Sequence, residues 1–218
     1  MEARRSSLPN IQQQAYELAY RLACEQLAAM DVVELCRRTG AQPTPGGGLS
    51  VEYLNRRYLV ALPGGEVSLM DGGEEIPLKD KVLVLHYLTS ARGTPATNKL
   101  ITFKQLPGCA SYFSVFHQLA IKPFLERFGK EPERLLNAAA ELGGRKAGYG
   151  DVSVTINAFP RVPLTFVLWR GDDEFPPRGS IIFDSSISDY LPAEDIRDLC
   201  AAIVRKLVRA YPRDNAAV

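Results

Sequence analysis

The sequence is poor in the residues on which metal-dependent and covalent catalysis usually rely. Only two histidines, His86 and His117, occur among its 218 residues. They do not form the His-Glu-x-x-His pattern of zinc hydrolases, and no Gly-x-Ser-x-Gly turn presents a nucleophilic serine. The four cysteines form no Cys-x-x-Cys pair, and none has zinc-ligand spacing to a histidine. We therefore predict reduced thiols and none of these catalytic centres.

Two further absences concern location and partners. The chain has no apolar run near the roughly 20 residues of a transmembrane helix, and no apolar stretch of a signal peptide follows its first residues. Its 26 basic and 25 acidic residues leave a net charge of +1. That charge provides no general attraction for nucleic acid or for an anionic membrane. We expect a cytoplasmic protein that binds neither.

The most informative stretch, residues 150–184, has the pattern of a sheet. From Val152 to Ala158 apolar residues alternate with polar ones, which is the period of a strand with one buried face. Residues 164–169 are almost wholly apolar, as in a central strand, and a third strand follows the polar loop at 171–177. The short connections predict an antiparallel meander.

The remaining pattern indicates the fold class and the organisation of the chain. Strand-like residues fall in two blocks, 49–70 and 152–183, instead of alternating strictly with helices, which predicts an α+β fold. We expect one antiparallel sheet from both blocks, packed against helices at 79–91, 109–128 and 193–210. The chain is interpreted as a single domain, with a helical segment at 1–40, a proline- and glycine-rich connector at 41–48 and a frayed tail at 212–218.

Two helices carry specific expectations. The first is capped by Asn10 and runs to about residue 29, and its apolar face is formed by Ile11, Ala15, Leu18 and Leu22. In the helix at 109–128, Pro123 lacks the N–H group that a regular helix needs, so we expect a kink there.

Several stretches resemble a known family. They are MDVVELCRRTGA (30–41), KVLVLHYLTSA (81–91), ITFKQLPGCASYFSVFHQLAIKPFLERFG (101–129) and the block at 150–196. Together they resemble the family described as domain of unknown function 3786, of anaerobic bacteria and archaea. The resemblance implies a setting in anaerobic metabolism and no established catalytic residue. Some relatives carry an added cysteine-rich iron–sulfur segment that this sequence lacks, which implies a redox or iron–sulfur partner protein.

Four residues form the candidate cofactor site: His86, Cys109, Tyr112 and His117. Both histidines lie in apolar or aromatic helical segments, and a buried imidazole among aromatic side chains is a suitable axial ligand for a tetrapyrrole metal. Cys109 follows Pro-Gly at a predicted helix N-terminus, where the helix dipole lowers the pKa of a thiol. The alternative is that both histidines are hydrogen-bonded core residues and that Cys109 fills space.

These features lead to one expected function and two alternatives. We expect a non-catalytic protein that binds or handles a cofactor of anaerobic metabolism, with a haem or a corrinoid as the ligand. One alternative is a protein–protein interaction module without a small ligand, which an exposed apolar patch would favour. The other is an enzyme with Cys109 as its nucleophile and His117 as the base. On a regular helix these two residues are about 12 Å apart along the axis, too far for direct contact.

Overall fold

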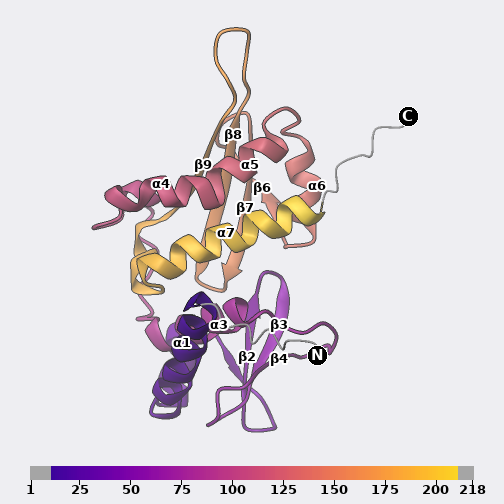
Figure 1. Cartoon of the computed structure of the whole chain (residues 1–218). Helices are drawn as coiled ribbons and strands as arrows, with labels where there is room; N and C mark the ends of the chain where they lie inside the picture. Colours follow the sequence, from indigo (N-terminus) through magenta and orange to yellow (C-terminus); the bar gives the residue numbers. More distant parts are fainter. Residues whose placement is uncertain (1–10, 211–218) are drawn as a thin grey trace, which may run out of the picture.

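The computed structural model describes residues 11–210, so Asn10 and the tail at 212–218 lie outside the described residues. Figure 1 shows two lobes, each with its own antiparallel sheet and its own covering helices. The predicted α+β class is therefore confirmed. No helix within residues 11–210 is long and apolar enough to span a membrane.

The N-terminal lobe, indigo to purple in Figure 1, contains a four-stranded sheet. Its elements are α1 (Ile11–Ala28), α2 (Val32–Thr39), β1 (Gln42–Pro43), β2 (Leu49–Tyr53), β3 (Arg56–Val60), β4 (Val67–Leu69) and α3 (Leu78–Ser90). The strands pair in sequence order because short turns join neighbours. Leu54 and Asn55 have φ angles of 51° and 62°, and they form the two-residue turn between β2 and β3.

The C-terminal lobe is built on a five-stranded antiparallel sheet. Its strands are β5 (Leu100–Thr102), β6 (Arg145–Lys146), β7 (Val152–Phe159), β8 (Val162–Trp169) and β9 (Arg178–Asp184). Its helices are η1 (Phe103–Gln105), η2 (Ala110–Tyr112), α4 (Phe113–Phe116), η3 (His117–Ile121), α5 (Lys122–Phe128), α6 (Arg134–Ala140), η4 (Ser185–Asp189) and α7 (Ala193–Ala210). The strand order is β5-β9-β8-β7-β6, so the predicted meander of β7, β8 and β9 forms its centre. Helices α5 and α7 lie across one face of this sheet (Figure 1).

The two strand blocks form separate sheets, whereas we predicted one sheet from both. A β-bulge shifts the register of β7 between Asn157 and Phe159, and Ala158 has no partner in β8. The Ala158 carbonyl instead accepts a hydrogen bond of 3.0 Å from the Leu54 N–H group, next to the β2–β3 turn. The second sheet therefore meets the first at this backbone hydrogen bond and does not continue into it.

A row of buried aromatic rings joins the two lobes. Phe159 of β7 stacks between Tyr53 of β2 and Tyr87 of α3, with ring centroids 4.9 and 4.2 Å apart. Tyr87 also stacks on Tyr190 at 6.2 Å, and its hydroxyl donates to the Thr39 carbonyl at 2.6 Å. Stacked aromatic pairs stabilise by about 0.5–1.5 kcal/mol beyond the area they bury. The two sheets thus share one hydrophobic core.

Helix α7 adds polar contacts to this junction. The carboxylate of Asp80, a buried residue of α3, receives the Lys206 Nζ at 2.9 Å and the Tyr53 hydroxyl at 3.3 Å. Tyr16 of α1 donates to Asp198 at 2.7 Å. Burial, which has the larger effect, and this hydrogen bond together raise the pKa of Tyr16 to about 12. The apolar stripe of α7 is buried throughout, at Ile196, Leu199, Cys200, Ile203 and Leu207.

The apolar face predicted for α1 does not point into the core. All four of its residues are exposed: Ile11, Ala15, Leu18 and Leu22. α1 packs on α3 with another face, on which Ala23 and Leu27 are buried and the Tyr20 hydroxyl donates to the Gly65 carbonyl at 3.2 Å. Tyrosines bury an aromatic ring while their hydroxyl groups bind polar atoms, so the aliphatic pattern alone marks the wrong face.

Asp184 holds the loop after α3 against the second sheet. Its Oδ1 accepts hydrogen bonds from the Thr97 N–H at 3.0 Å, the Thr97 hydroxyl at 2.8 Å and the Ser186 N–H at 2.9 Å. Burial acts to raise the pKa of Asp184. The hydrogen bonds favour the charged form more strongly and hold the pKa well below its usual range.

Candidate ligand-binding site

A groove beside His117 lies between β9 and the helical segment from α4 to α5. Its volume is about 300 Å³, at the lower end of the range for small-ligand pockets. The lining residues are Thr102, Phe103, Lys104, Phe113, Phe116, His117, Ile121, Leu125 and residues 177–181. Gly179 lets the strand approach the helix, because a Cβ at this position would lie 3.0 Å from the Leu125 Cδ2. We call this site the His117 groove.

Aromatic side chains form the apolar wall of the His117 groove. Phe103 and Phe116 are buried and stack in parallel, with ring centroids 4.3 Å apart and planes 1° apart. Phe113 extends this wall towards the surface, 6.1 Å from Phe116 and 6.2 Å from the His117 ring. Of the three rings only Phe113 is partly exposed, so a flat, apolar ligand can contact that ring, with the other two packed behind it.

A π-helix presents His117 to the groove. The helix predicted for 109–128 is divided into η2, α4, η3 and α5, and η3 is the π-helical segment. The Lys122 N–H donates to the His117 carbonyl, because Pro123 has no N–H group to continue the regular α-helical pattern. The irregularity expected at Pro123 is therefore a wider turn just before it. Single π-helical turns are frequent at functional sites.

Two cations stand at the rim of the His117 groove. Lys104 and Arg178 are exposed, and neither forms an ion pair with a carboxylate in residues 11–210. The Lys104 Nζ lies 5.9 Å from the centroid of the Phe113 ring. The groove thus combines an aromatic wall, one imidazole and two positive charges. This combination fits a flat ligand that carries acidic groups.

His86 is not part of the groove. Its Nδ1 lies 2.6 Å from Oδ2 of Asp195, so α3 and α7 are joined by this pair at the junction of the lobes. The His86 side chain is 26% exposed. The structure therefore separates the two histidines that the sequence analysis grouped together, because their helices belong to different lobes (Figure 1).

The prediction of a low pKa for the Cys109 thiol is wrong. Cys109 is buried, and burial, followed by the negative charge of Glu194, raises the pKa of its thiol. The 3-10 turn after Cys109 leads directly into α4, so burial of the thiol outweighs the effect of the helix end. Tyr112 is 62% exposed, and neither residue lines the His117 groove.

Several residues that line the His117 groove were not predicted from the sequence. Phe103 and Lys104 lie in a short 3-10 helix, and Arg178 and Ile181 lie on β9, more than 50 residues further along the chain. Only the pairing of β5 with β9 brings these segments together. No local periodicity signals that pairing, although the Phe-x-x-Phe-His run at 113–117 did mark the aromatic wall.

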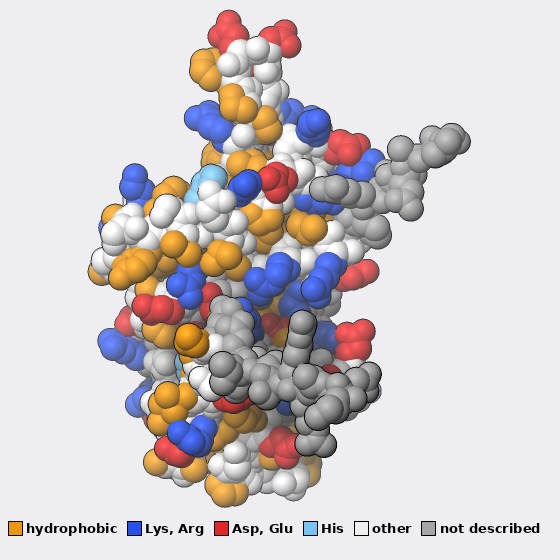
Figure 2. Space-filling view, viewed as in Figure 1, with side chains coloured by type: hydrophobic (Ala, Val, Ile, Leu, Met, Phe, Trp, Pro, Cys, Tyr) orange, Lys and Arg blue, Asp and Glu red, His pale blue; other side chains and the backbone are white. Residues whose placement is uncertain are grey.

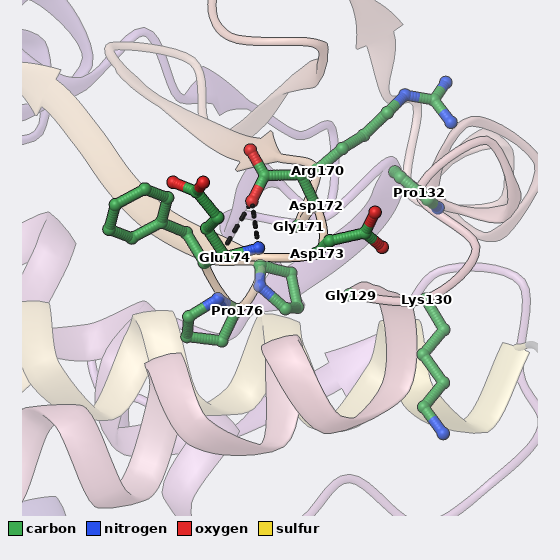
Figure 3. Close-up of a pocket in the computed structure, with 11 residues that line it drawn as sticks. Gly129, Lys130, Pro132, Arg170, Gly171, Asp172, Asp173, Glu174 and Pro176 are labelled. Carbon is green, nitrogen blue, oxygen red and sulfur yellow. Dashed lines mark hydrogen bonds between the residues drawn. The ribbon is translucent and has the colours of Figure 1, made fainter.

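A second cavity, of about 450 Å³, lies between the β8–β9 loop and the chain at Gly129, Lys130 and Pro132 (Figure 3). Arg170 forms an ion pair with Glu133 beside it. Asp172 Oδ1 accepts hydrogen bonds from the N–H groups of Glu174 and Phe175, at 2.9 and 2.7 Å, so this carboxylate stabilises the turn. No group of three or more His, Cys, Asp or Glu side chains in residues 11–210 is arranged to hold a metal ion.

The fold defines an α+β protein of two antiparallel sheets, with a groove that contains one histidine. A family model described as Domain of unknown function (DUF3786) matches residues 31–206, a range that includes both sheets and every residue lining the groove. The chain belongs to this family, which confirms the resemblance seen in the sequence. Searches of the curated proteins and of the solved structures find no match.

Proposed function

We propose that this protein binds a tetrapyrrole, a haem or a corrinoid, in the His117 groove, and that it handles this cofactor without catalysing a reaction. The observation that supports the proposal most directly is that His117 lines the same groove as an aromatic wall and two exposed cations. Tetrapyrroles are flat and largely apolar, and their side chains carry acidic groups or amides. Histidine is a common axial ligand of their metal.

Each part of the groove has a role in this proposal. The partly exposed Phe113 ring would provide the surface that the macrocycle contacts, with the buried Phe103 and Phe116 rings packed behind it, and the His117 imidazole would provide an axial nitrogen. Lys104 and Arg178 would form ion pairs with carboxylates at the edge of the ligand. A groove of about 300 Å³ encloses one edge of a macrocycle and leaves the rest accessible. Such a site suits a protein that receives a cofactor and passes it on.

The cellular setting is a further part of the proposal. We place the protein in the cytoplasm of an anaerobe, where a redox or iron–sulfur protein would be its partner. The net charge of +1 supports neither nucleic acid nor an anionic membrane as a second ligand.

Optical titration tests the proposal. Hemin and a corrinoid such as cobinamide are each added to the protein, and the Soret or corrinoid bands are recorded. We expect a saturable one-to-one shift that is lost in His117→Ala. His86→Ala is the matched control and should bind as the wild type does, because Asp195 holds that imidazole outside the groove. If neither ligand gives a saturable shift, or if both variants bind unchanged, the proposal is wrong.

An interaction module is the second candidate, and the outward face of α1 favours it. Ile11, Leu18 and Leu22 are 84%, 47% and 52% exposed, which is unusual for one stripe of a helix. Leu18→Ser/Leu22→Ser should leave hemin binding intact and abolish retention of a partner from an anaerobe lysate. A Lys99→Ser variant serves as the control, and equal retention by all three proteins would exclude this face.

A further inference from the structure

The loop between β8 and β9 extends beyond the helices as a long hairpin arm (Figure 1). At its tip Phe175 is 64% exposed, and Asp173 and Glu174 are exposed beside it. Figure 2 shows the acidic side chains gathered at this end of the molecule. An exposed aromatic ring flanked by carboxylates gives the arm a defined chemistry: it is acidic, and it carries one apolar anchor.

The tip of the arm has a fixed shape. Asp172 holds the turn through its two hydrogen bonds to backbone N–H groups (Figure 3), and the Asp172 N–H donates to the Phe175 carbonyl at 2.9 Å. A Cβ at Gly171 would lie 2.8 Å from the Pro177 nitrogen, so the two sides of the arm are in close contact. The Asp173 and Glu174 carboxylates leave the turn on opposite sides (Figure 3), and no described residue pairs with either. A preformed tip loses little conformational entropy on binding.

A groove of complementary chemistry lies at the junction of the lobes. It is bounded by α1, α3, α4, η3 and α7, and it has a volume of about 260 Å³. Val115 and Leu119, 45% and 43% exposed, form its apolar side. Lys79, Arg197 and Arg205 provide its positive charges. We call this site the basic groove.

The charges of the basic groove are only partly balanced. Asp198 is the one carboxylate among the residues that line it, and it is already bound by the Tyr16 hydroxyl at 2.7 Å and by the Arg197 Nε at 2.9 Å. Lys79 lies over the Tyr16 ring at 4.7 Å, and neither Lys79 nor Arg205 forms an ion pair with a carboxylate in residues 11–210. The groove therefore favours an apolar group accompanied by negative charges.

We propose that the arm of one molecule binds in the basic groove of a second copy of this chain. Phe175 would enter between Val115 and Leu119, while Asp173 and Glu174 meet Lys79 and Arg205. A cavity of about 150 Å³ can hold benzene, so the basic groove has room for a phenyl ring. The arm and the groove are different surfaces of the molecule (Figure 1), so the contact is head-to-tail and can continue from molecule to molecule.

Complementary variants test this proposal. The arm variant Asp173→Lys/Glu174→Lys and the groove variant Lys79→Glu/Arg205→Glu are compared with the wild type by sedimentation velocity over a concentration series. We expect the wild type to form dimers and larger species and each variant alone to remain monomeric, with at least a tenfold weaker association. Mixed one to one, the variants should associate again, because the intact arm of one variant meets the intact groove of the other and the reversed charges also match.

The controls separate this contact from general effects of charge or folding. Arg57→Glu/Lys99→Glu changes the charge as much as the groove variant does, on exposed residues outside both surfaces, and should associate as the wild type does. Circular dichroism establishes that each variant is folded, and Phe175→Ser tests the arm without any change of charge. A wild type that is monomeric at all concentrations, association that persists in either variant, or a mixture that stays monomeric would each overturn the proposal.

Discussion

Removal of the Lys206 charge should destabilise the junction between the lobes. Its Nζ lies 2.9 Å from Oδ2 of Asp80, whose side chain is 7% exposed, and among residues 11–210 the only other side-chain hydrogen bond to that carboxylate comes from Tyr53 at 3.3 Å. Lys206→Met keeps most of the side-chain volume but leaves the Asp80 charge buried with one weak partner. Loss of one partner from a fully buried ion pair costs about 3–5 kcal/mol.

The expected loss for Lys206→Met is smaller than that range. The Lys206 side chain is 34% exposed, so water can reach the carboxylate from its side. We expect a loss of about 2–3 kcal/mol in the free energy of unfolding, measured by urea denaturation, and a fall in Tm of about 5–10 °C. Asp80→Asn in the same chain should recover at least half of the loss, because it removes the unpaired charge.

Arg209→Met is the matched control on the same helix. Arg209 is exposed and forms no ion pair with a carboxylate in the described part of the chain, so its loss should change stability by less than about 0.5 kcal/mol. If Lys206→Met is as mild as Arg209→Met, the Asp80–Lys206 pair does not hold the lobes together and the reasoning is refuted.

Three further predictions follow from burial and hydrogen bonding. The pKa of Asp184 is lowered in the folded protein. Its contribution to the free energy of unfolding is therefore complete above about pH 4 and is lost as the pH falls below that value. Asp184→Asn should therefore cost about 1–2 kcal/mol at pH 7 in urea denaturation, and less at pH 2. Cys109 should react with iodoacetamide more slowly than the half-buried Cys36, as read by mass-spectrometric mapping; faster labelling would contradict its burial. Phe116→Ala removes a buried stacked ring and should cost about 3–5 kcal/mol in thermal or urea unfolding, and a cost below about 1 kcal/mol would show that the aromatic wall is not packed.

The fold was predictable where one local pattern decides the structure. The alternation from Val152 to Ala158 and the apolar run of β8 identified the meander. The separation into two sheets was not predictable, since it depends on a bulge at Ala158 that no sequence period reveals. The exposed apolar stripe of α1 shows the same limit. α1 packs with the face that carries Tyr20, Ala23 and Leu27, and the hydrogen bond from Tyr20 that fixes this face is a tertiary contact.

The candidate site was predictable only in part, for a related reason. His117 and its aromatic neighbours lie close together in the sequence, so the helix pattern was enough to mark them. His86 looked equivalent because it also lies in an apolar helix, but its Nδ1 is bound to Asp195, which is 109 residues away. Strand pairing brings Lys104 and Arg178 to the same groove, and the burial of Cys109 depends on the packing of the whole lobe.

Imidazole rescue of a cavity variant tests the central claim most directly. His117→Gly removes the proposed axial ligand and leaves space for free imidazole beside the aromatic wall. Hemin is added to this variant, and the Soret band is recorded with and without imidazole. We predict that imidazole restores the position of the wild-type band in His117→Gly and changes nothing in His86→Gly. A wild-type Soret band in His117→Gly without imidazole would contradict the account.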